Sequence, residues 1–302
     1  MGSTTTALGA DSQGLSRLPD GRLLRDAIEA DPVGFLGPEH VSRWGANPAL
    51  LVKLLDAGER LPVHFHPGRP FARDALGLAF GKTEAWIIVA ADQDAVVHLG
   101  FTEAVQRSTL VRWLHEQDIE AMLRAMNELP VRTGSVLFVP AGTAHSIGKG
   151  ILLVELQEPT DLSVLLEWQR FGVGDSDAHL GLGWERVLDA VELAPGPVNA
   201  ERNDSTAAED GVADLLPGAA DPYFRAQRIA IEGERVSLEP SFAILVVLEG
   251  ALTLSGERGQ PFALHRGDTA LVPHGAGPTA LEGNATVIRC RPPDPNAGAG
   301  RW

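Results

Sequence analysis

The sequence predicts a mainly β protein of two β-barrels, with a helical insertion in the first barrel. Short runs rich in β-branched and aromatic residues recur along most of the 302-residue chain, and such runs are typical of strands. The 33 glycines and 21 prolines supply frequent turns between them. A chain of this length can also bury two separate hydrophobic cores.

Charge and composition restrict the possible partners and the compartment. The formal net charge of −15 repels phosphate backbones and anionic lipids, so we expect neither nucleic acid nor a membrane as a partner. No apolar run reaches the roughly 18 residues of a membrane helix, and residues 1–10 lack the features of a signal peptide. The single cysteine, Cys290, excludes an internal disulfide, so we expect a cytoplasmic protein.

Changes in composition predict the domain boundaries. Residues 193–220 are rich in Ala, Pro, Gly, Asp and Asn and poor in large apolar side chains, which is typical of a linker. The predicted parts are a loose tail over 1–20, a metal-binding domain over 21–195, a linker over 196–221, a second domain over 222–292 and a disordered tail over 293–302.

In the first domain, predicted strands surround one long amphipathic segment. A helix over 23–30 ends at Asp31-Pro32, and the apolar run over 50–55 fits either a strand or a helix turn. Residues 102–129 carry apolar residues at helical spacing, which predicts one or two inserted helices. Strands are predicted over 61–66, 84–90, 96–101, 135–139, 144–147 and 151–157, and a further helix over 184–192.

The second domain shows the same pattern of short strands between glycine turns, which indicates a second small barrel. Its strands are predicted over 243–248, 251–254, 269–272 and 286–289. Residues 269–275 resemble 136–142 of the first domain, because each segment follows a glycine and reads strand, proline, turn. Common ancestry of two barrels would explain this similarity, and so would chance. His265 and His274 have no carboxylate partner, so we expect no metal here.

A cluster of potential metal ligands lies in the first domain. His64 and His66 are two residues apart in a predicted strand, so both side chains project from the same face. Glu84 and His145 each open another predicted strand. Three imidazoles and a carboxylate suit Zn²⁺, Fe²⁺, Mn²⁺, Ni²⁺ or Co²⁺. We therefore predict one divalent metal bound by these four residues.

Five segments of the first domain match a known family in order and spacing. They are VKLLDA (52–57), VHFHP (63–67), GKTEAW (81–86), FVPAGTAHSIG (138–148) and LVELQ (153–157). Through them, residues 51–170 resemble the type I mannose-6-phosphate isomerases (phosphomannose isomerases), especially the short bacterial forms. The resemblance implies two cupin-like (jelly-roll) barrels, the second without metal, and a zinc-dependent aldose–ketose isomerase.

The sequence departs from this family at two positions. The family ligands are Gln, His, Glu and His, so His64 takes the place of the Gln. After the Asp at Asp161, the resemblance implies an arginine where this chain has Leu165. A missing guanidinium removes a group that binds phosphate or stabilises an enediolate. Arg170 lies further along the chain and is the candidate to replace it.

The resemblance implies that mannose 6-phosphate becomes fructose 6-phosphate through a cis-enediolate. Lys82 lies two residues before Glu84 and is a candidate donor to a sugar hydroxyl or phosphate; a solvated lysine at the barrel rim is the alternative. Glu155 lies within an apolar run and is a candidate base, or a partner of a ligand imidazole. Together with Arg170, these are the predicted catalytic residues.

Two other functions remain open. Leu165 and the His64/His66 pair favour another metal cupin enzyme that acts on an unphosphorylated sugar. A non-catalytic cupin that binds a sugar is the second alternative. Phosphate-binding loops, dinucleotide motifs, a serine nucleophile elbow and CxxC pairs are absent from the sequence, which argues against NTP, NAD and hydrolase chemistry. The sequence sets no expectation for the oligomeric state.

Overall fold

The computed structural model describes residues 15–196, 200–202, 211–257 and 259–297. Its contacts divide the chain into two compact units. The central unit is Leu54–Arg202, and the terminal unit combines Met1–Lys53 with Asn203–Trp302. Composition predicts that residues 21–53 belong to the first domain, whereas the structure groups them with the C-terminal strands. An amphipathic helix carries no local signal of which barrel it packs against, which explains the difference.

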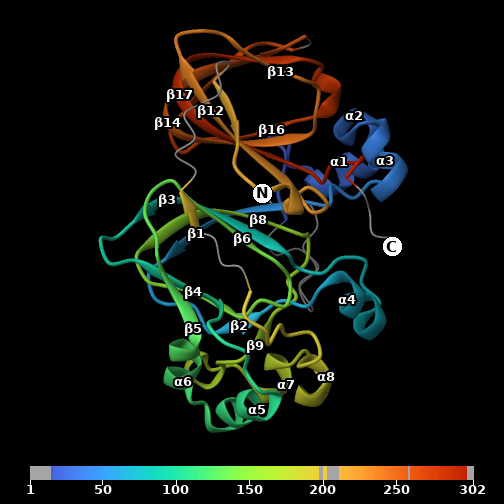
Figure 1. Ribbon diagram of the computed structural model, residues 1–302. Coiled ribbons are helices and arrows are strands. Elements are labelled where there is room, and N and C mark those ends of the chain that lie inside the picture. Colours follow the sequence, from blue (N-terminus) through green and yellow to red (C-terminus); the bar gives the residue numbers. More distant parts are fainter. Residues whose placement is uncertain (1–14, 197–199, 203–210, 258, 298–302) are drawn as a thin grey trace. The chain divides into compact units, whose positions relative to one another are not determined.

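The central unit confirms the prediction of mainly antiparallel β structure (Figure 1). One sheet has the strand order β1-β8-β3-β6-β10, and the other has the order β5-β4-β7-β2-β9. The strands are β1 (Leu51–Ala57), β2 (His64–Phe65), β3 (Glu84–Ala91), β4 (Val96–Phe101), β5 (Met126–Pro130), β6 (Ser135–Val139), β7 (His145–Ile147), β8 (Ile151–Gln157), β9 (Val164–Leu165) and β10 (Ala200–Arg202). The ambiguous run over 50–55 is therefore mostly strand.

The helical insertion is also present, although it is shorter than predicted. It consists of α5 (Arg107–Glu116) and α6 (Ile119–Ala125), and the chain then enters β5 at Met126. Apolar Met126 and Leu129 extended the helical pattern in the sequence, but this segment pairs with β4 instead. The other helical elements of the unit are α4 (Arg69–Leu76), η1 (Gln169–Phe171), α7 (Asp175–Ala178) and α8 (Trp184–Val187).

Two hydrophobic cores stabilise the central unit. The first includes Trp86, Leu137, Leu153 and Ile147 from strands of both sheets. The second joins Phe65 and Phe101 to buried residues of the inserted helices, including Leu110, Leu114 and Met122. In Figure 1, α5, α6, α7 and α8 gather at the end of this unit near β2 and β9. The insertion therefore covers the sheet that carries His64 and His145.

The terminal unit contains a third antiparallel sheet with the strand order β11-β12-β17-β14-β15, in which β13 pairs with β17 and β16 with β14. Its core is apolar and includes Ile229, Leu245, Leu281 and Val287. The elements are α1 (Leu24–Ala30), α2 (Pro32–Leu36), α3 (Pro38–Trp44), β11 (Val212–Asp214), η2 (Gly218–Ala220), β12 (Arg225–Glu232), β13 (Val236–Leu238), β14 (Ala243–Gly256), β15 (Phe262–His265), β16 (Thr269–Val272), η3 (His274–Ala276) and β17 (Thr279–Arg291).

The predicted linker and tails have more structure than their composition suggests, in the parts that the structure describes. In the linker, Ala200–Arg202 forms β10 on β6, and Val212–Asp214 forms β11 on β12. In the tail expected to be disordered, the Asp294 amide donates to the Asp221 carbonyl at 2.8 Å. Backbone hydrogen bonds do not require large apolar side chains, so composition does not reveal them. Residues 1–14, 197–199, 203–210 and 298–302 of these segments lie outside the described residues.

The two strands predicted over 243–248 and 251–254 form the single strand β14. This strand contains a bulge between Val247 and Glu249 where it pairs with β17. The next residue, Gly250, has φ +74°, and a Cβ there would lie 2.0 Å from the Asn284 carbonyl oxygen.

We expect Gly250→Ala to lower the unfolding temperature through both strain and steric overlap. Gly233→Ala, at φ +83° with no atom within 4 Å, is the matched control and should cost only the left-handed conformation, about 1–2 kcal/mol. Equal losses in thermal unfolding would contradict the role of the close approach.

Candidate metal centre

The centre is built on the pairing of two short strands. His64 of β2 lies directly opposite His145 of β7 in the antiparallel register. Side chains of residues directly opposite in antiparallel strands project from the same face, so both rings enter the barrel. On its other side, β2 pairs with β9, where Leu165 is opposite His64. His66 follows one residue beyond β2 and, as the spacing predicts, joins the same group.

The candidate ligand atoms of His64, His66 and His145 all lie within 4.8 Å of one another, and the three residues are buried. Each Nδ1 atom faces a backbone carbonyl oxygen, from Pro62 at 2.7 Å, Leu162 at 2.7 Å and Thr143 at 2.9 Å, respectively. Because a carbonyl only accepts, we assign the proton to Nδ1 in each ring. Nε2 then carries the lone pair that a metal ion requires.

Glu84 completes the group of four predicted ligands. It is buried at the first position of β3, and its Oε1 lies 3.1 Å from Nε2 of His66. Its Oε2 lies 3.7 Å from Nε2 of His145 and accepts a hydrogen bond from the Trp86 indole at 3.2 Å. The indole thus fixes the orientation of the carboxylate. The structure brings together all four residues that the sequence identified as ligands.

Burial keeps the imidazoles neutral. Burial, reinforced by neighbouring positive charge, lowers the pKa of both His66 and His145 to about 3. Burial also lowers the pKa of His64 well below its usual value. For Glu84, burial alone would raise the pKa, but the positive charge of Lys82 outweighs it and holds the pKa well below the usual value. Neutral imidazoles and an ionised carboxylate are the forms that bind a divalent cation.

One atom shows that the donor set fits a metal ion. Nε2 of His145 is buried and has no hydrogen-bond partner among the described residues. A buried acceptor without a partner is costly, and a bound ion would satisfy it. Within the part of the chain that the structure describes, His64, His66 and His145 form the group that could hold a metal ion.

Of the predicted catalytic residues, Lys82 lies at the centre itself. Its Nζ is 2.6 Å from Oε1 of Glu84 and 3.0 Å from Nε2 of His66. Burial alone would lower the pKa of Lys82, but the charges of Glu84 and Glu155 outweigh burial and raise it. Lys82 is therefore a buried ammonium group rather than a solvated lysine at the rim. It shares the lone pair of His66 Nε2, so this contact and metal binding by the same atom exclude each other.

Glu155 lies on the same inner face as Glu84. Its strand, β8, pairs with β3 so that Glu155 is opposite Trp86 and Gln157 is opposite Glu84. Residues opposite one another share a face, and Glu84 and Trp86 alternate onto the same side. Glu155 is only 4% exposed, and its charge acts on Lys82. The structure therefore brings this predicted residue to the centre as well.

Arg170 lies elsewhere. Its side chain is 57% exposed, pairs with Glu59 at 3.8 Å and stacks over the ring of Phe171. The structure does not bring it to the histidine cluster, because η1 directs it toward a surface partner. Its predicted catalytic role stays a prediction.

A buried ion pair that sequence reasoning missed holds β2 in place. Glu167 accepts two hydrogen bonds from Arg60, both at 2.7 Å, and a third from the Val63 amide at 3.0 Å. Arg60 also reaches Ser146, the residue after His145, at 3.3 Å. These contacts fix the backbone just before His64 and just after His145. The two partners are 107 residues apart in the sequence, so no local pattern could have revealed them.

Comparison with known proteins identifies the family of this chain. "Mannose-6-phosphate isomerase ManA" of Bacillus subtilis (strain 168) is 31% identical over 243 residues, which is 79% of this chain and 73% of that protein. The chain belongs to the type I mannose-6-phosphate isomerase family. The family's members named in these comparisons are sugar-phosphate isomerases, and this chain is an enzyme of that class. "Mannose-6-phosphate isomerase" of Streptococcus mutans is 27% identical over 93% of this chain and 86% of its own length.

The second barrel and the fold agree with this family. The model of the mannose-6-phosphate isomerase cupin domain matches residues 219–292. The crystal structure of mannose 6-phosphate isomerase from Bacillus subtilis is similar with a TM-score of 0.73 and 24% identity, covering 90% of this chain and 82% of that one. A mutant phosphomannose isomerase from Salmonella typhimurium gives 0.71 and 15%, covering 93% and 90%. Both likenesses show the cupin fold.

Metal analysis tests the centre directly. We expect the protein to bind one equivalent of Zn²⁺, and His66→Ala or His145→Ala to weaken binding by at least about tenfold, because each removes one of few ligands. Equilibrium dialysis followed by elemental analysis measures this. His115→Ala, at an exposed position of helix α5, is the control and should bind as the wild type does. Unchanged zinc binding in both ligand variants would disprove the assignment.

Proposed function

We propose that this protein is a metal-dependent isomerase that converts mannose 6-phosphate to fructose 6-phosphate through a cis-enediolate. Its relatives carry the name of this activity. The observation that carries the proposal is the convergence of three neutral imidazoles, the carboxylate of Glu84 and the ammonium of Lys82 in one buried place. The proposed partner is a small sugar phosphate, and the predicted cytoplasmic location suits the buried, unpaired Cys290.

In this proposal, His64, His66, His145 and Glu84 hold one divalent ion, with Zn²⁺ as the first candidate and Fe²⁺, Mn²⁺, Ni²⁺ or Co²⁺ as the others. The ion, when bound, supplies Lewis-acid stabilisation of the sugar oxygens on which negative charge develops. The carbonyls of Pro62, Leu162 and Thr143 keep the rings oriented, so the protein does not reorganise its ligands during the reaction.

Lys82 is the proposed donor to the substrate. Its raised pKa means that it enters the reaction as an ammonium group, and Glu84 anchors it at 2.6 Å. A buried ammonium group interacts strongly with an oxygen that gains negative charge, because little water screens the interaction. Lys82 therefore stabilises either the sugar oxygen at the reacting carbons or the phosphate group.

Glu155 is the proposed base that moves the proton between the two reacting carbons. It is a buried carboxylate on the inner face of β8, within electrostatic reach of Lys82. A single carboxyl group can remove the proton from C2 and deliver it to C1, because both carbons of a planar cis-enediolate present the same face to that group.

One observation favours a second candidate function. Leu165 lies directly opposite His64, where the family resemblance implies an arginine. Arg69, another cation near the HFHP strand, is bound to buried Glu158. A metal isomerase of an unphosphorylated sugar needs no such guanidinium, so this activity is the alternative to the phosphomannose reaction.

Substrate assays separate the two candidates. We expect the zinc-loaded protein to interconvert mannose 6-phosphate and fructose 6-phosphate, with kcat/KM at least about a hundredfold above that for mannose or lyxose, because charge-assisted phosphate contacts contribute to binding. A coupled assay and NMR of the products measure this. Turnover of the free sugars alone would transfer the assignment to the alternative. Binding without turnover in the metal-loaded protein would leave a sugar-binding cupin.

The role of Glu155 predicts a kinetic signature. Glu155→Gln should lower kcat by about 10²–10⁴-fold with little change in KM or zinc content, because the amide keeps the shape but cannot take a proton. Glu120→Gln, on the exposed side of α6, is the control and should leave kcat unchanged. If Glu155→Gln instead loses zinc with kcat per bound ion preserved, Glu155 supports a ligand and another group is the base.

A further inference from the structure

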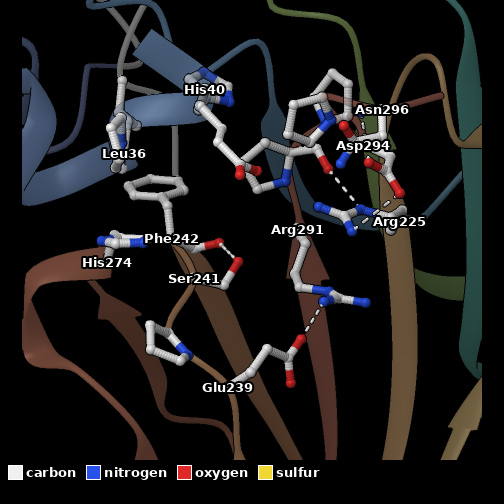
Figure 2. A pocket seen from close by; sticks show the side chains of 17 residues that line it. Leu36, His40, Arg225, Glu239, Ser241, Phe242, His274, Arg291, Asp294 and Asn296 are labelled. Carbon is white, nitrogen blue, oxygen red and sulfur yellow. Dashed lines mark hydrogen bonds and ion pairs between the residues drawn. The ribbon is translucent and has the colours of Figure 1, made fainter. Parts of the chain in front are cut away.

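The terminal unit contains a pocket of about 460 Å³, within the usual size range of small-molecule sites (Figure 2). Its walls come from the junction of α2 and α3, the start of β12, the loop between β13 and β14, η3 and the chain that follows β17. All of the lining residues belong to this one unit. Neither the metal centre nor its predicted catalytic residues contribute to it.

Strand pairing concentrates positive charge at this pocket. Arg225 of β12 lies directly opposite Arg291 of β17 in the antiparallel register. Arg289, two residues before Arg291, lies on the same face. Like charges directly opposite one another destabilise a sheet. Figure 2 shows the guanidinium groups of Arg225 and Arg291 near each other on one side of the pocket, away from Leu36, Phe242 and His274.

Three carboxylates, from Glu39, Glu239 and Asp294, also line the pocket beside Arg225 and Arg291. Oε1 of Glu239 accepts from both Arg289, at 3.1 Å, and Arg291, at 2.5 Å. Asp294 lies 3.7 Å from Arg225, longer than a hydrogen bond. Within the described part of the chain, Arg289 and Arg291 thus share the carboxylate of Glu239, and Arg225 pairs with Asp294. The charge of Asp221 also acts on Arg225, and neither Asp221 nor Arg289 lines the pocket.

Two further observations indicate unused binding capacity. Nε of Arg291 is buried without a hydrogen-bond partner among the described residues. Burial and then the charge of Arg291 lower the pKa of Arg225 and of Arg289. The buried guanidinium groups therefore repel one another, and an added anion would relieve this repulsion. Such an anion must compete with the carboxylates of Glu39, Glu239 and Asp294, so a compact group that binds both arginines at once is favoured.

We propose that this pocket binds a small metabolite through one oxyanionic group, a phosphate or a carboxylate, held between Arg225 and Arg291. The remainder of the ligand faces a mixed wall in which the Ser241 hydroxyl oxygen and the Glu39 carboxylate accept hydrogen bonds from hydroxyl groups and Phe242 provides apolar contact. The site is separate from the metal centre and does not depend on the proposed isomerase activity. A ligand here would bind regardless of whether the first barrel turns over mannose 6-phosphate.

Calorimetric titration of the full-length protein with inorganic phosphate and, separately, with citrate tests the proposal. We expect one of the two probes to bind. Arg291→Gln should either remove one binding site or weaken the affinity at least about tenfold, because it loses a charge-assisted contact. Arg228→Gln removes an exposed arginine of the same strand as Arg225 and should change nothing. The metal centre is the same in all these proteins, so any binding there is common to every titration.

Ser241→Phe provides a second variant in case Arg291→Gln disturbs the sheet. It fills the pocket from the loop between β13 and β14, leaves the arginines intact and should also abolish the site. Binding of phosphate alone or citrate alone identifies the oxyanion. The proposal is overturned if neither probe binds below about 10 mM, or if Ser241→Phe and a folded Arg291→Gln bind as the wild type does.

Discussion

The candidate metal centre depends on a set of hydrogen bonds from imidazole rings to backbone carbonyls. His64 and His145 each reach the carbonyl two residues earlier in their own extended segment, at Pro62 and Thr143. His66 instead reaches Leu162, which lies 96 residues away. These bonds fix both the tautomer and the direction of each ring, and burial keeps the rings neutral. Without them, three histidines in the same barrel would not present three lone pairs to one point.

The strand that carries two of these histidines is short and needs support from outside its ladder. β2 spans only His64–Phe65, so its pairing with β7 and β9 supplies few backbone hydrogen bonds. The Arg60–Glu167 pair adds contacts to the backbone at Val63 and to Ser146. A buried ion pair of this kind adds little net stability, because desolvation offsets the attraction. Its contribution is to position the strand, which explains a costly pair beside a metal centre.

Local pattern predicted the parts of this site that follow from periodicity, and missed those that follow from tertiary pairing. The alternation of His64 and His66 and the strand starts at Glu84 and His145 predicted four converging side chains, and the structure brings these four together. The Arg60–Glu167 pair and the grouping of residues 24–44 with the terminal unit left no trace in sequence spacing, because both depend on contacts between distant segments. Bulged β14 appeared as two strands, since a glycine turn signal and a bulge look alike in sequence.

The two barrels differ in what fills their interiors, and the helical insertion adds a second hydrophobic core to the central one. The interior of the central barrel holds histidines, carboxylates and a lysine in space that apolar side chains would otherwise fill. Such a barrel loses part of its hydrophobic core, and the inserted helices provide a second one around Leu110, Leu114 and Met122. The terminal barrel keeps an apolar interior, with Leu245, Leu281 and Val287. Its polar cluster lies instead at one end, beside α2 and α3, where guanidinium groups can gather without displacing the core.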